Sequence, residues 1–166
     1  MSATEHCFAC GGLVPKTEGP THRYLAGAPG CWEVYGRLLV KEYSRRAYWS
    51  VHPLTVDVYA AQHPGTPSPQ TIQSAAVHLI GMCAVLERGG SPEAGSGFKQ
   101  KVKAQLKDEF EWLEPPNTVG EITVVEVAAA RDAAQHVERV NAWAQSTWDA
   151  WVAHHDTIRA WIDRLD

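Results

Sequence analysis

The sequence predicts an all-α protein, a helical bundle with an irregular metal-binding segment at its N-terminus and a long C-terminal helix. Apolar residues recur at spacings of three and four in four separate stretches, which is the pattern of helices with one buried face. Clusters of proline and glycine separate these stretches. The 166 residues, 45% of them hydrophobic, suit one domain with its own core. We predict a single domain over 1–166, made of a zinc-knuckle loop segment (1–30), a three-helix unit (31–88), a flexible loop (89–97) and C-terminal helices (98–166).

The N-terminal segment carries the clearest chemical signal. Cys7 and Cys10 are separated by two residues and followed by Gly11 and Gly12, as in a knuckle that wraps backbone around one metal ion. Thiolates at this spacing suit Zn²⁺, which takes four Cys or His ligands tetrahedrally. Cys31 opens the first helical stretch and is the expected third ligand. The alternative is that the cysteines are unliganded thiols.

Three helices are expected in the first half of the chain. The first spans Cys31 to about Ser44, and the second runs from Pro53 to His63. The third is capped by Ser68 and ends at Gly89. The predicted buried face of the first helix consists of Trp32, Tyr35, Leu39 and Tyr43.

The second half is predicted to hold three more helices. One starts near Phe98 and is stopped by Glu114 and the prolines that follow it, with its lysines simply solvated. Residues 121–130 are read as a short helix, although their β-branched residues leave a strand open. The longest helix starts at Asp132, with Gln135 as a capping partner, and continues to the C-terminus over about 34 residues, or roughly 50 Å.

Helix geometry ranks the candidates for the fourth zinc ligand. If the first two helices form an antiparallel hairpin, His63 lies opposite Cys31, so Cys7, Cys10, Cys31 and His63 would form a Cys3His site. His22, in the loop before the first helix, and His52, at the far end of the hairpin, are the competitors. A histidine at a helix C-terminus can also bond the last carbonyl groups, which is the structural alternative for His63.

The other histidines suggest a second site. Antiparallel pairing of the second and third helices places His78 near His52, with Asp57 further along the second helix. His155, rather than His154, should face inward from the C-terminal helix. We therefore predict that His52, Asp57, His78 and His155 line one partly open pocket, suited to a metal-bound water with Asp57 as base or orienter. The alternative is that these are unrelated, hydrogen-bonded core residues.

Several motifs resemble a bacterial family known only as a domain of unknown function. They are Cys-x2-Cys-Gly-Gly at residues 7–12, Pro-Gly-Cys-Trp at 29–32, the run from His52 to Gly65, and the segment from Trp148 to His155. The resemblance covers nearly the whole chain. It implies importance for the three cysteines, His52, Asp57 and His63, and implies no substrate.

Composition and motifs exclude several classes of function. A net charge of −4 argues against nucleic-acid binding, the apolar stretches are too short to span a bilayer, and no export signal is visible, so a cytoplasmic protein is expected. Common phosphate-binding and hydrolase motifs are absent. Two readings remain. One is a structural zinc site supporting a second pocket for metal-dependent chemistry on a small molecule. The other is a non-enzymatic, zinc-stabilised module that binds a protein or small molecule.

Overall fold

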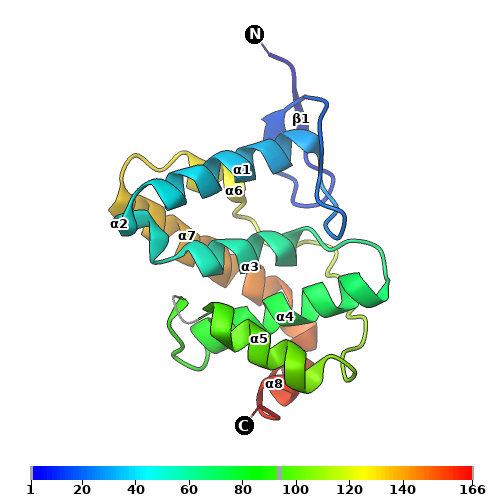
Figure 1. Cartoon of the computed structure of the whole chain (residues 1–166). Helices are drawn as coiled ribbons and strands as arrows, with labels where there is room; N and C mark the ends of the chain where they lie inside the picture. Colours follow the sequence, from blue (N-terminus) through cyan, green and yellow to red (C-terminus); the bar gives the residue numbers. More distant parts are fainter. Residues whose placement is uncertain (1, 93–94, 166) are drawn as a thin grey trace.

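The computed structural model describes residues 2–92 and 95–165, and these residues are mainly helical, as predicted (Figure 1). Eight α-helices and one two-stranded sheet make up the regular structure of the described residues, together with one short 3₁₀ helix. In chain order these are β1 (Thr4–His6), β2 (Leu13–Pro15), α1 (Pro29–Ser44), α2 (Arg46–Trp49), α3 (His52–Gln62), α4 (Pro69–Leu86), α5 (Gly95–Leu106), α6 (Val124–Ala128), α7 (Ala133–Ala150), η2 (Val152–His154) and α8 (His155–Ile162).

Helix α3 is the centre of the fold. It lies between α1 and α4 and packs against α7 as well (Figure 1). Only Pro53 and Val56 of its residues are partly exposed. A helix buried on nearly all sides must pair its polar side chains with neighbouring elements, because an unpaired polar group in a core costs about 1–3 kcal/mol.

Gln62 shows how completely α3 meets this requirement. Its side-chain amide nitrogen donates to the carbonyl oxygens of Val119 (2.9 Å) and Ile122 (2.7 Å), and its carbonyl oxygen accepts from Trp143 Nε1 (2.8 Å). Trp143 is itself fully buried. One side chain of α3 therefore ties the loop before α6 and the middle of α7 to the core.

The buried face of α1 differs from the prediction by about one residue. Cys31, Tyr35, Leu38 and Glu42 are buried, whereas the predicted Tyr43 is 66% exposed. Neighbouring residues on a helix point about 100° apart, so a rotation of α1 by about one residue exchanges one face for the next. Cys31 faces the Cys3His cluster and Glu42 faces α3, and this orientation turns Tyr43 outward.

Capping side chains explain where α4 and α6 start. Ser68 accepts a hydrogen bond from Thr71 N at the start of α4, as expected for the predicted cap. A second capping box, formed by Thr123 and Glu126, starts α6. This box is why residues 124–128 form the predicted short helix and not a strand, despite their β-branched side chains.

Two predicted helices are shorter than expected. Helix α5 ends at Leu106, before Glu114, because Phe110 and Leu113 reach the core from a non-helical segment, with Phe110 packed edge-on against Trp161. The long C-terminal helix is broken at Trp151, where the backbone leaves α geometry and continues as η2. The bend lets α8 pack against α4.

Two elements of the structure were not predicted from the sequence. Residues 46–49 form the short helix α2, not a simple connection. The N-terminal segment contains the hairpin β1–β2, in which Thr4 pairs with Pro15 and His6 pairs with Leu13. Gly30 allows β2 to touch α1, since a Cβ on Gly30 would lie 1.8 Å from the carbonyl oxygen of Pro15. None of the described helices is both long and apolar enough to cross a membrane.

Candidate metal centre

The turn of the β1–β2 hairpin holds the first two candidate ligands. Cys7 N donates to the carbonyl oxygen of Gly12 (2.9 Å), and Gly11 N donates to that of Cys7 (2.8 Å). Gly11 has a φ of 79°, a left-handed conformation that favours glycine. These bonds curl the chain so that the buried thiols of Cys7 and Cys10 face the same point.

The other two ligands come from helix ends. Cys31 lies in the first turn of α1, and His63 follows the last residue of α3. His63 Nδ1 donates to the carbonyl oxygen of Tyr59 (2.7 Å), so the second ring nitrogen, Nε2, is free to bind a metal. His63 Nε2 lies 3.3 Å from Cys31 Sγ. The hairpin geometry predicted for α1 and α3 is therefore present.

The four side chains fit one tetrahedral ion. The sulfur atoms of Cys7, Cys10 and Cys31 and Nε2 of His63 all lie within 4.8 Å of one another, and the four residues are buried. The sulfurs of Cys10 and Cys31 are 3.8 Å apart. Thiolates at about 2.3 Å from a tetrahedral zinc would be separated by about 3.8 Å. This Cys3His cluster could therefore hold a metal ion with no residue displaced.

Electrostatics also favour a cation at this point. Hydrogen bonding with Cys10 and Cys7, together with burial, raises the pKa of the Cys31 thiol far above its usual value. Three crowded thiols cannot all ionise alone, but a divalent cation among them stabilises the thiolates. Two donors already point at the sulfurs: Ala28 N at 3.4 Å from Cys7 Sγ, and Tyr59 OH at 3.6 Å from Cys31 Sγ.

His22, the main competitor for the fourth position, lies outside the cluster. Its Nδ1 accepts a hydrogen bond from Tyr24 N (3.1 Å), and its ring packs against those of Tyr24 and Trp32. Burial and the nearby charge of His78 lower the pKa of His22. His52, the second competitor, lies at the opposite end of α3 from His63.

Gly27 supports His63 by leaving room for its ring. A Cβ at Gly27 would lie 2.9 Å from His63 Cδ2 and 3.6 Å from Cys7 Sγ, while the Gly27 backbone is not in the left-handed region. We expect Gly27→Ala to displace the imidazole and to weaken Zn²⁺ affinity about 10- to 100-fold, the usual effect of disturbing the groups around a ligand. Competition with a chromophoric chelator measures this change.

Gly36→Ala is the matched control for this prediction. Gly36 lies in α1 and a Cβ there would meet no atom within 4 Å. Its Zn²⁺ affinity should equal that of the unmodified protein. Equal affinity of the Gly27 variant would show that the ring is not held by this contact.

The second predicted pocket does not form as one site. His52 belongs to a separate buried network centred on Glu42 of α1. Glu42 accepts hydrogen bonds from His52 Nδ1 (2.7 Å), Thr55 Oγ1 (2.5 Å) and His136 Nε2 (2.8 Å). His52 is stacked on Trp49, with ring centroids 4.5 Å apart. His52 is the first residue of α3 and faces α1, while Asp57 faces α4, so the two do not share a pocket.

Asp57 and His78 do meet, although the predicted pairing of α3 with α4 placed His78 near His52, with Asp57 further along the helix. His78 Nδ1 donates to Asp57 Oδ1 (2.7 Å). Lys99 of α5 lies 2.5 Å from the same oxygen, with its side chain only 17% exposed, so this lysine is not the simply solvated residue expected from the sequence. The amphipathic pattern of α5 gave no sign of this partner, because Lys99 is one of several similar lysines there.

His155 faces inward, as predicted, but into a different environment. Its Nε2 donates to the carbonyl oxygen of Trp148 (2.8 Å), and its ring stacks on that of Trp148 at 4.0 Å. His155 of α8 therefore contacts α7 across the bend between the two helices. The structure thus separates the four predicted pocket residues into three places, and only Asp57 and His78 stay together.

The role of Glu42 as the centre of a buried hydrogen-bond network was not predicted from the sequence. A signal was available, because Glu42 lies four residues after Leu38 and seven after Tyr35, on the same helix face. A carboxylate in such a stripe indicates a buried partner. The Glu42 network resembles a catalytic arrangement of a carboxylate with histidines. The same hydrogen bonds also provide partners for the polar side chains at the buried start of α3.

The fold and this site define a mainly helical protein with a candidate Cys3His metal centre. The chain belongs to a family of unknown function, DUF5946, whose model matches residues 5–152. No curated protein and no solved structure matches the chain.

Proposed function

We propose that this protein is a zinc-stabilised binding module. The observation that carries the proposal is the closed Cys3His cluster, whose four donors come from the hairpin, α1 and the end of α3. Three thiolates and one imidazole complete the tetrahedral shell of Zn²⁺ and leave no position for a substrate, so the ion has a structural role. It fastens the hairpin to the helices.

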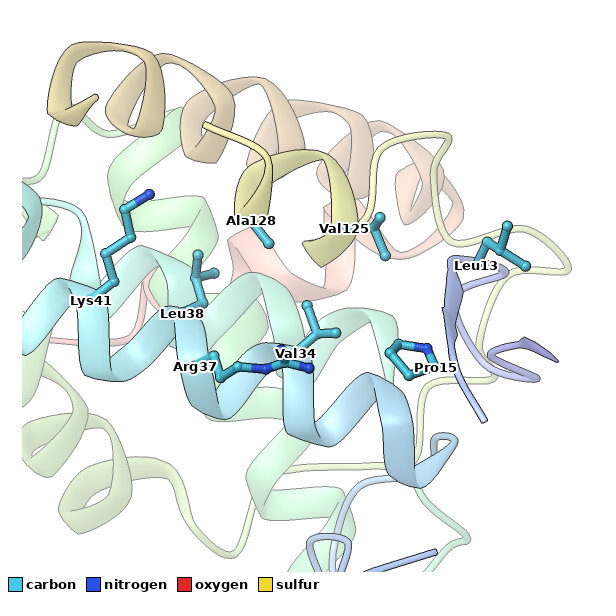
Figure 2. Close-up of a pocket in the computed structure, with 8 residues that line it drawn as sticks. All are labelled: Leu13, Pro15, Val34, Arg37, Leu38, Lys41, Val125 and Ala128. Carbon is cyan, nitrogen blue, oxygen red and sulfur yellow. The ribbon is translucent and has the colours of Figure 1, made fainter. Parts of the chain in front are cut away.

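The zinc-held hairpin forms one wall of a surface groove, which Figure 2 shows. The groove has a volume of about 390 Å³ and lies between β2, α1 and α6. Leu13 and Pro15 line it from β2. Its other lining residues are Val34, Arg37, Leu38 and Lys41 from α1 and Val125 and Ala128 from α6. The hairpin therefore supplies one of the three walls of the groove.

Charge indicates the kind of partner. The whole chain carries a net charge of −4, but the groove is lined by two cations and no carboxylate. Arg37 pairs only with the exposed Glu33 (3.2 Å), a contact worth little in water. Leu13, which lines the same groove, is 53% exposed. The proposed partner is a short protein segment with apolar side chains and a nearby Asp or Glu.

We expect peptides selected on the zinc-loaded protein from a random 12-residue phage library to be apolar with an acidic residue. Arg37→Glu should weaken binding of such a peptide roughly tenfold at low salt, because it reverses a charge beside the groove. Isothermal titration calorimetry measures the change. Removing zinc with a chelator should abolish binding, since the hairpin wall is lost.

Lys107→Glu is the matched control, because it makes the same charge change at an exposed residue outside the groove. It should leave the affinity unchanged. An equal loss in both variants would indicate general electrostatic attraction and would contradict the groove. Selected peptides without acidic residues would contradict the proposed partner chemistry.

Metal-dependent chemistry at a second site has less support. It requires His52, Asp57, His78 and His155 around one open position, but only Asp57 and His78 contact each other, while His52 bonds Glu42 and His155 bonds Trp148. Within the described residues, the Cys3His cluster is the one group of three or more such donors close enough to share an ion. A second, exchangeable metal in elemental analysis would favour the enzyme over the binding module.

A further inference from the structure

We propose that a second cavity, between α3, α4, α5 and α8, binds a neutral and mostly apolar small molecule that donates one hydrogen bond to Asp57. The cavity lies on the side of α3 away from the hairpin and α1 (Figure 1). The inference is independent of the proposed function, because none of the groove residues lines it.

The walls of the cavity are mostly apolar. Its volume is about 260 Å³, and its lining includes Pro53 of α3, Val85 of α4, Phe98 of α5 and Ile162 of α8. Pockets for drug-sized ligands are about 300–1,000 Å³. A compact ligand with one ring or a short branched chain therefore suits the space.

One buried carboxylate interrupts these apolar walls. The Asp57 side chain is only 4% exposed, and its Oδ1 accepts from His78 and lies beside the Lys99 ammonium group. Among the described residues, no donor hydrogen-bonds Oδ2. That oxygen lies beside Gly81, where a Cβ would be only 2.5 Å away, and Gly81 lines the same cavity. Glycine thus leaves Oδ2 open as an acceptor at the cavity wall.

The charges around Asp57 decide between a neutral and a charged ligand. Lys99 already balances the carboxylate, and Arg88, which pairs with Asp163 (2.7 Å), also lines the cavity. A cationic head group would therefore approach two cations, and an anionic one would approach the carboxylate. A hydroxyl or amide N–H can donate to Oδ2 without adding charge. Such a bond is favourable, since a hydrogen bond to an ionised acceptor is stronger than one to a neutral acceptor.

Benzyl alcohol, toluene and benzylamine test this site as probes of nearly equal size. We expect benzyl alcohol to shift the amide resonances of Gly81, Val85 and Phe98 in ¹H–¹⁵N spectra of the zinc-loaded protein. Its dissociation constant should be roughly tenfold lower than that of toluene, as expected for one hydrogen bond to a charged group. Benzylamine should also bind more weakly than the alcohol.

Two variants locate the effect. Ala84→Phe should fill the cavity and abolish binding of all three probes, whereas Val40→Phe, at an exposed position of α1 outside the cavity, should change nothing. In Asp57→Asn, the amide oxygen stays with His78 and Lys99, so the amide NH₂ faces the cavity. This variant should still bind toluene and should show a smaller preference for the alcohol, because the hydroxyl could then only accept a weaker bond from a neutral amide.

Native-like spectra of each variant confirm folding before the comparison is made. The proposal is overturned if benzyl alcohol shifts none of the three resonances in the unmodified protein, or if toluene or benzylamine binds as tightly as the alcohol. It is also overturned if Ala84→Phe, once folded, binds the alcohol normally.

Discussion

Replacing Cys31 by serine is expected to abolish zinc binding and to destabilise the whole chain. Cys31 joins the hairpin to the helices, since its sulfur lies 3.8 Å from that of Cys10 and 3.3 Å from His63 Nε2. A structural zinc site is worth about 10–16 kcal/mol of apparent binding free energy in small zinc domains. This is comparable to the stability of an entire domain, about 5–15 kcal/mol. Elemental analysis measures the zinc content, and thermal unfolding followed by circular dichroism measures the loss of stability.

Two further variants define the result. Cys10→Ser should also lose zinc but should loosen residues 1–30 before the helices, which hydrogen exchange can resolve. Cys83→Ala is the control, because Cys83 is a buried thiol in α4 outside the cluster. It should retain about one zinc per chain. Full zinc content in Cys31→Ser, or native helicity in metal-free protein, would contradict a structural zinc site.

Replacing Glu42 by alanine is expected to cost about 3–5 kcal/mol of folding free energy, the usual penalty for removing one partner from a buried charged network. The substitution leaves His52, Thr55 and His136 without their shared acceptor. His136 Nδ1 already has no hydrogen-bond partner in the described structure. Chemical denaturation measures the loss of stability.

Glu33→Ala is the control on the same helix. Glu33 forms only an exposed pair with Arg37, so its loss should change stability by less than about 1 kcal/mol. If the two alanine variants were equally stable, the Glu42 network would not be a structural element of the core.

The environment of Glu42 also predicts that the stability of the fold depends on pH. Burial alone would raise the pKa of Glu42, but hydrogen bonds from His136, His52 and Thr55 outweigh it and hold this pKa below its usual value. The folded state therefore binds fewer protons than the unfolded state. The stabilisation is fully present above the unfolded pKa of about 4.3 and is lost as the pH falls through the lower folded pKa. In Glu42→Gln, stability should fall less steeply below about pH 4.

Local signals in the sequence determined the helical class and the candidate metal ligands. Spacing of three and four predicts a helix without knowledge of its neighbours, and Ser68 at a helix start is a local cap. Cys7 and Cys10 are close in the chain, so the convergence of their thiols follows from spacing alone. His63 could be predicted because only one short connection separates α1 from α3, and this fixed which ends lie together.

Tertiary packing decided the rest. The break at Trp151 and the position of α8 follow from contacts with α4, which no local pattern contains. Asp57 and His78 met because α3 and α4 are joined by a short turn, but Lys99 comes from a helix further along the chain. His52 hydrogen-bonds Glu42 because α1 is rotated by about one residue from the predicted face. A rotation of about 100° costs little within one helix, so only packing against α3 could select the residue that faces inward.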